Sequence, residues 1–264
     1  HPYQWATIGQ DLKQIEDARM EDVKAFFKKH YNPQNAIMVV GGNVKTEDIR
    51  RMAEKWFEPI PAGEKYVRNL PKEPLQTEAR EVIVKANVPL NAIYMAFKMP
   101  ARNDESYQSF DLLSDVLSQG QSSRLYNTLL KEQQLFSDVH AYITSSIDEG
   151  LFVIEGKLVE GVSVATAETA IWKELEKIKE ELITVDELTK VQNKSESIMV
   201  FSELNLLDKA MNLAYYELLG DADLLNTEID RYLAVTAEQI QQAAQQIFVK
   251  EQCSILYYLI AKDA

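Results

Sequence analysis

The sequence has little of what several functional classes require. Its 264 residues include one cysteine, Cys253, so no internal disulfide framework can form. It contains no apolar run of roughly 18 residues, which excludes a membrane-spanning helix and favours a soluble protein. Basic side chains number 28 against 41 acidic ones, which gives a net charge of -13. Because nucleic-acid binding needs a clustered basic face, this balance argues against a nucleic-acid partner.

The acidic excess has two interpretations. It can serve solubility alone, or it can form an acidic chamber that favours basic peptides. The chain starts at His1-Pro2-Tyr3, with neither an initiator methionine nor a signal peptide, so the sequence assigns no cellular compartment.

Common catalytic motifs are missing as well. The three histidines, His1, His30 and His140, lie outside any H-x-x-E-H or H-x-x-x-H spacing and outside any Cys/His cluster. The sequence has no G-x-S-x-G elbow, no P-loop and no G-x-G-x-x-G turn. We therefore expect no catalytic residue and no metal ligand in this chain.

What the sequence does contain is an incomplete repeat. Residues 18–40 have the pattern of an amphipathic helix, a turn and a strand, and residues 235–257 follow the same plan without a gap. Val23 aligns with Ile240, and Tyr31 aligns with Phe248. A repeat of this period has the size of a domain. The second copy has a whole domain before it, whereas the first has only the last part of one.

Prolines divide the chain between these copies. Pro59, Pro61, Pro71 and Pro74 follow one another closely, which is typical of an extended linker. We predict three parts: residues 1–58 as the end of a first half, 59–76 as the linker, and 77–264 as a complete second half.

Hydrophobic periodicity predicts the elements of both parts. The expected strands are 36–40, 81–85, 92–99, 136–145, 151–158 and 254–260. The expected helices are 18–30, 46–57, 104–118, 122–133, one from about 164, one from Thr184 towards Gly220, and one after Thr236. Paired antiparallel strands followed by long helices indicate an α+β fold, an antiparallel sheet covered by helices on one face.

One loop has two interpretations. The segment from Gly120 to Arg124 resembles an anion-binding nest at a helix N-terminus, but it also fits a loop capped by serines, which is the favoured interpretation.

The ordered motifs resemble the insulinase/pitrilysin-type zinc metallopeptidases, including the processing peptidases, whose zinc motif is H-x-x-E-H. The resemblance spans nearly the whole chain and rests on the following residues: His1-Pro2-Tyr3 to Ile8-Gly9, Phe26, Tyr31, Asn32-Pro33, Asn35-Ala36, Val39 to Val44, Trp56-Phe57, Ile60-Pro61, Gln119 to Tyr126, Asp148 to Phe152, and Val235-Thr236. It implies a processing-peptidase-like fold of two homologous halves.

The resemblance also implies zinc-dependent hydrolysis of peptide bonds, with two His and a distant Glu as ligands and a Glu that activates water. In such proteins these residues lie upstream of the segment that matches His1-Pro2-Tyr3. We therefore expect zinc in a full-length parent protein, and neither zinc nor activity in this chain alone.

The sequence departs from the family in the second half. Members often carry an Arg and a Tyr seven residues apart that grip substrate, and these positions are Leu130 and Ser137 here. The usual Gly-Leu before that Tyr is Gln134-Leu135. Arg124 is a further candidate for contact with substrate, although we expect it to cap or pair locally.

Two functions stay open. The parent is either a zinc endopeptidase that hydrolyses peptides enclosed between its two halves, or a non-catalytic peptide-binding or assembly subunit related to processing-peptidase and respiratory core proteins. Either one is expected to act as a homodimer or as a heteromer with a homologous subunit. The presence of H-x-x-E-H before His1 would distinguish them.

Overall fold

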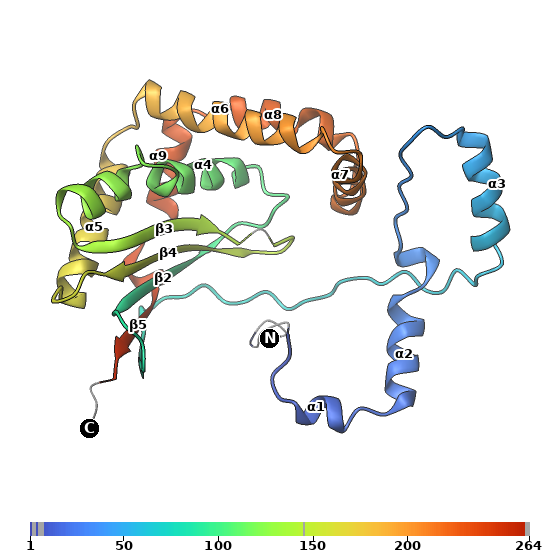
Figure 1. The fold of residues 1–264 in the computed structure, drawn as a ribbon, viewed down its shortest axis with the longest axis horizontal. Coiled ribbons are helices and arrows are strands. Elements are labelled where there is room, and N and C mark those ends of the chain that lie inside the picture. Colours follow the sequence, from blue (N-terminus) through green and yellow to red (C-terminus); the bar gives the residue numbers. More distant parts are fainter. Residues whose placement is uncertain (2–3, 5–7, 145, 262–264) are drawn as a thin grey trace. The chain divides into compact units, whose positions relative to one another are not determined.

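The computed structural model describes residues 1, 4, 8–144 and 146–261 (Figure 1). Pro2, Tyr3 and Ser145, which belong to predicted motifs or elements, lie outside the described residues. The chain divides into two compact units. The first comprises His1–Pro74 with Ser202–Leu225, and the second comprises Leu75–Phe201 with Asn226–Ala264.

The first unit is helical over its described residues. Its elements are α1 (Lys13–Glu16), α2 (Met20–His30), the 3-10 turn η2 (Pro33–Asn35), α3 (Thr46–Phe57) and α7 (Leu206–Leu219). The predicted helices at 18–30 and 46–57 are confirmed as α2 and α3. The predicted strand at 36–40 is wrong: this segment forms no ladder with any described strand. A strand needs a neighbour to satisfy its main-chain groups, and the periodicity of residues cannot supply one.

Two asparagines organise the turn after α2. The amide of Asn32 donates to the carbonyl oxygens of Lys29 (3.0 Å) and Glu64 (3.2 Å), and its oxygen accepts from the backbone nitrogen of Gln34. The Asn35 oxygen accepts from the backbone nitrogen of Tyr66 at 2.7 Å. The Asn-Pro turn thereby fastens the start of the Pro-rich segment, and the chain forms no helix or strand from there to residue 79.

The second unit contains a five-stranded sheet with the order β1-β5-β2-β4-β3. Its strands are β1 (Arg80–Ala86), β2 (Ala92–Met99), β3 (Phe136–Ile143), β4 (Gly150–Leu158) and β5 (Ser254–Ile260). Every pairing is antiparallel except β1 with β5, which is parallel. The expected antiparallel sheet is therefore a mixed one, because β1 and β5 come from opposite ends of the unit.

One face of this sheet is buried. In β2, Ile93, Met95 and Phe97 are almost fully buried and alternate with partly exposed residues. The ring of Phe248 lies 5.3 Å from the rings of both Phe97 and Phe152. Two helices, α4 (Tyr107–Ser118) and α9 (Ala237–Ile247), lie against the sheet (Figure 1), and their apolar side chains belong to the same core. Burial of these side chains is the main stabilising contribution to the unit.

The helices of this unit are α4 (Tyr107–Ser118), the π-helical segment η3 (Tyr126–Glu132), α5 (Val164–Glu180), α6 (Val185–Ser202), α8 (Leu224–Leu233) and α9 (Ala237–Ile247), with a 3-10 turn η4 (Lys250–Gln252) before β5. The end of α6 and the start of α8 belong to the first unit. The helix expected from Thr184 towards Gly220 is two helices, α6 and α7. Asn205 interrupts it because its side chain accepts from the backbone nitrogen of Leu207 and caps α7.

The α+β class is confirmed, with one sheet and helices against it. The repeat also has a structural counterpart, because α2 with η2 and α9 with η4 share the order of helix and 3-10 turn. Only the second copy continues into a strand, β5, which lies between β1 and β2. The division into homologous halves at residues 1–58, 59–76 and 77–264 stays a prediction.

Candidate functional site

The positions aligned with the substrate-gripping pair have other uses here. Leu130 lies half-buried in η3. Ser137 is exposed near the start of β3, and its hydroxyl donates to the carbonyl oxygen of Lys157 at 3.2 Å. The structure therefore has an apolar side chain at residue 130 and a short hydroxyl, already bonded to the neighbouring strand, at residue 137.

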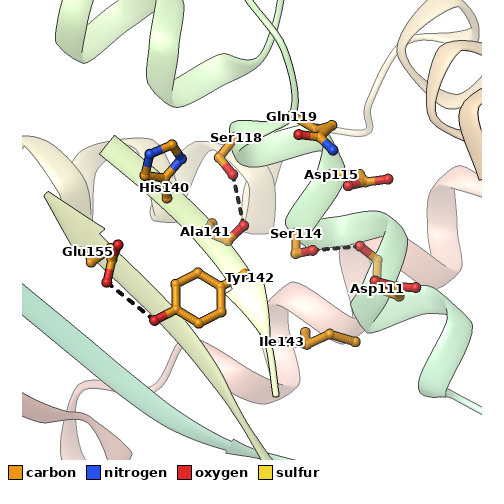
Figure 2. A pocket seen from close by; sticks show the side chains of 10 residues that line it. All are labelled: Asp111, Ser114, Asp115, Ser118, Gln119, His140, Ala141, Tyr142, Ile143 and Glu155. Atoms are coloured by element: carbon orange, nitrogen blue, oxygen red, sulfur yellow. Dashed lines mark hydrogen bonds between the residues drawn. The ribbon is translucent and has the colours of Figure 1, made fainter. Parts of the chain in front are cut away.

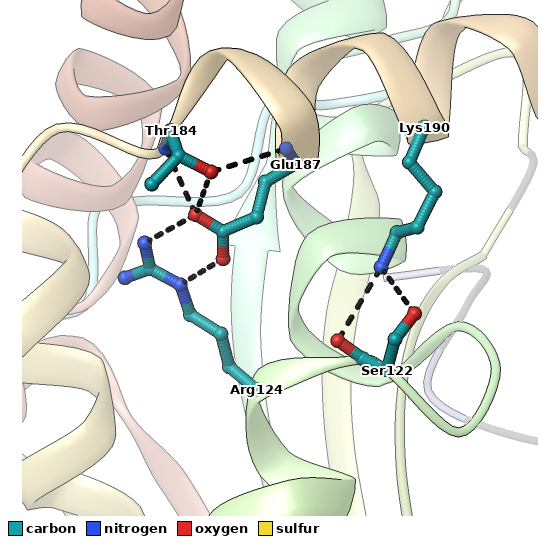
Figure 3. A network of polar contacts seen from close by, with 5 residues as sticks. All are labelled: Ser122, Arg124, Thr184, Glu187 and Lys190. Atoms are coloured by element: carbon teal, nitrogen blue, oxygen red, sulfur yellow. Dashed lines mark hydrogen bonds and ion pairs between the residues drawn. The ribbon is translucent and has the colours of Figure 1, made fainter.

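Arg124 makes a local ion pair, shown in Figure 3. Its Nε and Nη2 atoms donate to Oε1 and Oε2 of Glu187, at 2.7 and 3.0 Å. Glu187 also accepts from the backbone nitrogen of Thr184 at 2.8 Å, while the Thr184 hydroxyl accepts from the backbone nitrogen of Glu187. This is a reciprocal capping box at the start of α6.

Charge and hydrogen bonding stabilise this pair. The donated hydrogen bonds of Arg124 hold the pKa of the Glu187 carboxyl at about 2, well below its usual range. The same bonds raise the pKa of the Arg124 guanidinium. Close by, the Lys190 ammonium lies 3.1 Å from the Ser122 hydroxyl. The loop at 122–124 is thus fastened to α6 at two points.

Gln134 has an unusual backbone. Its φ of 52° lies in the left-handed region that favours glycine, directly after the end of η3. The next residue, Leu135, donates its backbone N–H to the carbonyl oxygen of Leu129 at 3.0 Å and closes the helix end. The backbone here has a conformation that glycine, the residue expected at this position from the resemblance, adopts without strain.

The strongest candidate for a binding site is a depression of about 470 Å³ between α4 and β3 (Figure 2). Helix α4 contributes Asp111, Ser114, Asp115 and Ser118, and Gln119 follows it; β3 contributes residues 140–143, and β4 contributes Glu155. The lining is polar and rich in carboxylates, so it suits a cationic or hydrogen-bonding ligand.

Asp111 is held by a residue far away in sequence. The Tyr232 hydroxyl of α8 donates to Asp111 Oδ2 at 2.5 Å. Burial nevertheless raises the pKa of the Asp111 carboxyl, and burial with the nearby carboxylate raises the pKa of the Tyr232 hydroxyl. The Ser114 hydroxyl donates to the backbone carbonyl of Asp111 at 2.8 Å, within the helix.

Asp115 has a cationic partner. The Lys194 ammonium of α6 lies 3.0 and 3.2 Å from its two carboxylate oxygens. Burial still raises the pKa of the Asp115 carboxyl. The pairing disfavours metal binding, because the Lys194 ammonium beside the carboxylate repels a divalent cation.

The spacing of Asp111, Ser114 and Asp115 is that of the inverted zinc motif, with carboxylates in place of both histidines and a serine in place of the glutamate. The residues do not fit zinc. His140 is engaged with Asp138, at 2.7 Å. Across the described residues, no group of three or more His, Cys, Asp or Glu side chains could hold a metal ion.

The depression adjoins a sheet edge. Thr144 donates its backbone N–H to the Leu151 carbonyl at 2.8 Å, so alternate residues of β3 turn their main-chain groups towards β4. The main-chain N–H and C=O groups of Val139, Ala141 and Ile143 consequently point away from β4. The Ser118 hydroxyl already donates to the Ala141 carbonyl at 2.8 Å. Outward main-chain groups of this kind are the ones that bind an extended peptide by strand addition, although the Ala141 carbonyl already has a partner.

Sequence reasoning missed this site. Its signal was present, since Asp111, Ser114 and Asp115 at i, i+3 and i+4 share one face of α4. Their partners lie 79 and 121 residues away, a separation that no local pattern reveals.

The fold and the ordered motifs together indicate the class of protein to which the chain belongs, the α+β domains of the metallopeptidase family. Among known proteins, the chain is 27% identical over 260 residues to the zinc protease PqqE of Helicobacter pylori, covering 97% of this chain and 58% of that protein. It is also 27% identical over 233 residues to the zinc protease YmxG of Bacillus subtilis, covering 88% and 56%.

Solved structures of related proteins share this fold. A protease from Helicobacter pylori superposes with a TM-score of 0.87 at 26% identity, over 98% of this chain and 63% of that one. A peptidase M16 inactive domain from Pseudomonas fluorescens shares the fold, with a TM-score of 0.81 at 19% identity over 99% and 62%. The family described as "Peptidase M16 inactive domain" matches residues 17–195, and the chain belongs to it.

The chain therefore spans less than two thirds of the length of these relatives. The resemblance to the zinc metallopeptidases is confirmed. In the described part of the chain, no helix combines the length and the apolar character that crossing a membrane would require.

Proposed function

We propose that this chain is the non-catalytic portion of a zinc-dependent endopeptidase, and that it encloses peptide substrates together with a zinc-bearing half. The observation that carries the proposal is membership of the inactive-domain family. The relatives that the chain matches along most of its length are named zinc proteases, which supports zinc in the parent protein.

Exposed apolar faces in the first unit support a larger parent. Phe26 and Phe27 of α2 are 59% and 60% exposed, and Trp56 of α3 is 65% exposed. Large apolar surfaces of this kind are costly in water and mark sites of packing. We infer that the rest of the first half covers them.

The β3 edge and the depression beside it form the peptide-contacting surface in this proposal. Outward main-chain groups of β3 would bind the peptide backbone irrespective of its sequence. The carboxylates of Asp111 and Glu155 favour peptides with basic side chains over acidic ones, whereas Asp115 is already paired with Lys194. Leu130 and Ser137 provide neither a cationic nor a phenolic group to bind substrate. In this proposal a homologous partner subunit supplies those groups to the parent.

The test compares this chain with the parent polypeptide that contains it. Zinc content is measured by atomic emission, and hydrolysis of unstructured peptides is measured with and without a chelator. We expect the chain alone to carry no stoichiometric zinc and to release no product, and the parent, with any partner subunit, to show chelator-sensitive hydrolysis.

Chelator-sensitive turnover by the chain alone would contradict the proposal. Binding of peptides by the parent without zinc or hydrolysis would instead establish the alternative, a non-catalytic binding or assembly subunit.

A further inference from the structure

The other edge of the sheet is exposed and apolar. Strand β1 is accessible over nearly its whole length, and Val82, Ile83 and Val84 are 55%, 62% and 38% exposed. Such an edge offers unpaired main-chain groups beside apolar side chains, and natural proteins cover or charge edges of this kind to prevent uncontrolled association. The charges of β1 lie at its two ends, beside the apolar centre.

The main-chain geometry fixes which groups are available. Arg80 donates its N–H to the Cys253 carbonyl at 3.0 Å, and the Ala86 carbonyl accepts from Ala261 at 2.8 Å. Since alternate residues of a strand point to opposite sides, residues 80, 82, 84 and 86 face β5. The N–H and C=O groups of Glu81, Ile83 and Lys85 face outwards.

The sequence of β1, Arg-Glu-Val-Ile-Val-Lys-Ala, is complementary to itself when reversed. An antiparallel pairing centred on Ile83 sets Ile83 opposite Ile83 of the partner subunit, in a position where both exchange main-chain hydrogen bonds. The same register sets Glu81 opposite Lys85 of the partner subunit, twice by symmetry. On the other face it sets Val82 opposite Val84 of the partner subunit.

We propose that a second copy of this chain docks on the β1 edge, antiparallel about Ile83, so that one continuous sheet runs through both copies. Symmetry of this kind is that of the commonest homodimers, in which one patch meets itself. Hydrogen bonds, apolar cross-strand pairs and opposite charges all coincide in one register, and shifting it by one residue would lose each of them. Because a single strand supplies the contact, we expect a reversible dimer.

Charge reversal tests the register. In Glu81→Lys or Lys85→Glu, like charges face each other at both symmetry-related positions, and we expect the dimer dissociation constant, measured by analytical ultracentrifugation, to rise about tenfold or more. The double variant Glu81→Lys/Lys85→Glu restores opposite charges and is expected to recover the wild-type value.

Cross-linking provides an independent test. Cys253 is fully buried, so a cysteine introduced at residue 83 would be the accessible thiol. Ile83→Cys is expected to form a disulfide between subunits on mild oxidation. Val82→Cys is the matched control, since in this register residue 82 lies diagonal to its own counterpart, beyond disulfide reach.

A third test removes the outward main-chain donor of Ile83. Ile83→Pro eliminates an N–H that does not bond to β5, so we expect the sheet within each copy to form as before. The dimer loses a main-chain hydrogen bond at its centre, so we expect it to dissociate. Circular dichroism and thermal unfolding establish that the variant is folded.

A chain that is monomeric at every concentration, a dimer unaffected by Ile83→Pro, or single and double charge variants that behave alike would each overturn the proposal.

Discussion

Arg124 and Glu187, 63 residues apart in sequence, face each other through two parallel hydrogen bonds of 2.7 and 3.0 Å. Two such bonds match the planar guanidinium to the carboxylate and fix its orientation. The pair joins the loop before η3 to the first turn of α6. Arg124, which the sequence analysis expects to cap or pair locally, is thus bound to a helix of its own unit.

Replacing Arg124 by Gln should lower the free energy of unfolding by about 2 kcal/mol at neutral pH, since Glu187 loses two charge-assisted bonds while staying partly screened by solvent. Urea titration measures the change. Lys190→Gln is the control, because it removes an exposed contact between the same loop and helix, and we expect a loss below about 0.5 kcal/mol. Equal losses in both variants would contradict a special role for the Arg124 pair.

The same pair predicts a pH dependence. The pKa of Glu187 is lowered from 4.5 to about 2 in the folded chain, so its stabilisation is present above about pH 4.5 and is lost as the pH falls towards 2. The gap in stability between the wild type and Arg124→Gln should therefore narrow across this interval. A gap that stays constant down to pH 2 would show that the guanidinium stabilises through packing alone.

The sequence predicted those elements whose pattern is decided locally. The predicted strands 92–99 and 254–260 coincide with β2 and β5, because alternation or apolar runs end there at turn residues. The helix predicted after Thr236 is confirmed as α9, and Thr236 and Gln239 form a capping box at its start. The family resemblance supplied what periodicity could not, namely the kind of protein to which the fold belongs.

The failures concern partners that periodicity cannot identify. The apolar run at 36–40 reads as a strand, yet a ladder depends on a neighbouring strand. The parallel partner of β1 comes from the far end of the unit, so the mixed sheet was not foreseen. At the site, no local pattern identifies Tyr232 and Lys194, which bind Asp111 and Asp115 across the helix layer.

Asp111 and Tyr232 yield a second prediction. Tyr232→Phe removes the hydroxyl that donates to Asp111, and we expect a loss of about 1–2 kcal/mol at neutral pH, because a buried carboxylate is left with less compensation. The pKa of Asp111 is already raised by burial and should rise further. The folded state then binds the proton more tightly, so the loss shrinks as the pH falls and the carboxyl becomes neutral.

Asp111→Asn serves as the matched variant for this pair. Its amide oxygen still accepts from Tyr232 and carries no charge to desolvate, so stability at neutral pH should equal or exceed that of the wild type. Chemical denaturation over a pH series measures both variants. A penalty for Tyr232→Phe that grows in acid would contradict this account of the pair.

Glu228 yields a third prediction, because it is 1% exposed and joins several elements. Its Oε1 accepts from Arg102 at 2.7 Å and from Gln108 at 3.0 Å, and its Oε2 lies 3.4 Å from Arg231. Glu228→Gln leaves the buried Arg102 guanidinium without its carboxylate, so we expect a loss of about 3 kcal/mol. Arg231→Gln, at the more exposed and longer contact, should cost less than about 1 kcal/mol. Thermal unfolding of both variants measures the difference, and losses of equal size would contradict the ranking.

Gln134 gives the last prediction, an increase in stability. Its φ of 52° is a conformation that a side chain disfavours and that glycine adopts freely, and it ends η3 as a left-handed cap. Gln134→Gly should therefore raise the free energy of unfolding by about 0.5–1 kcal/mol, the relief of left-handed strain exceeding the added entropy of the unfolded chain. Gln133→Gly is the control: its φ of -86° is ordinary, so glycine there only adds unfolded-state entropy and should destabilise. If both variants lost stability, the helix end would tolerate glutamine without strain, and the family's glycine at this position would need an explanation other than backbone conformation.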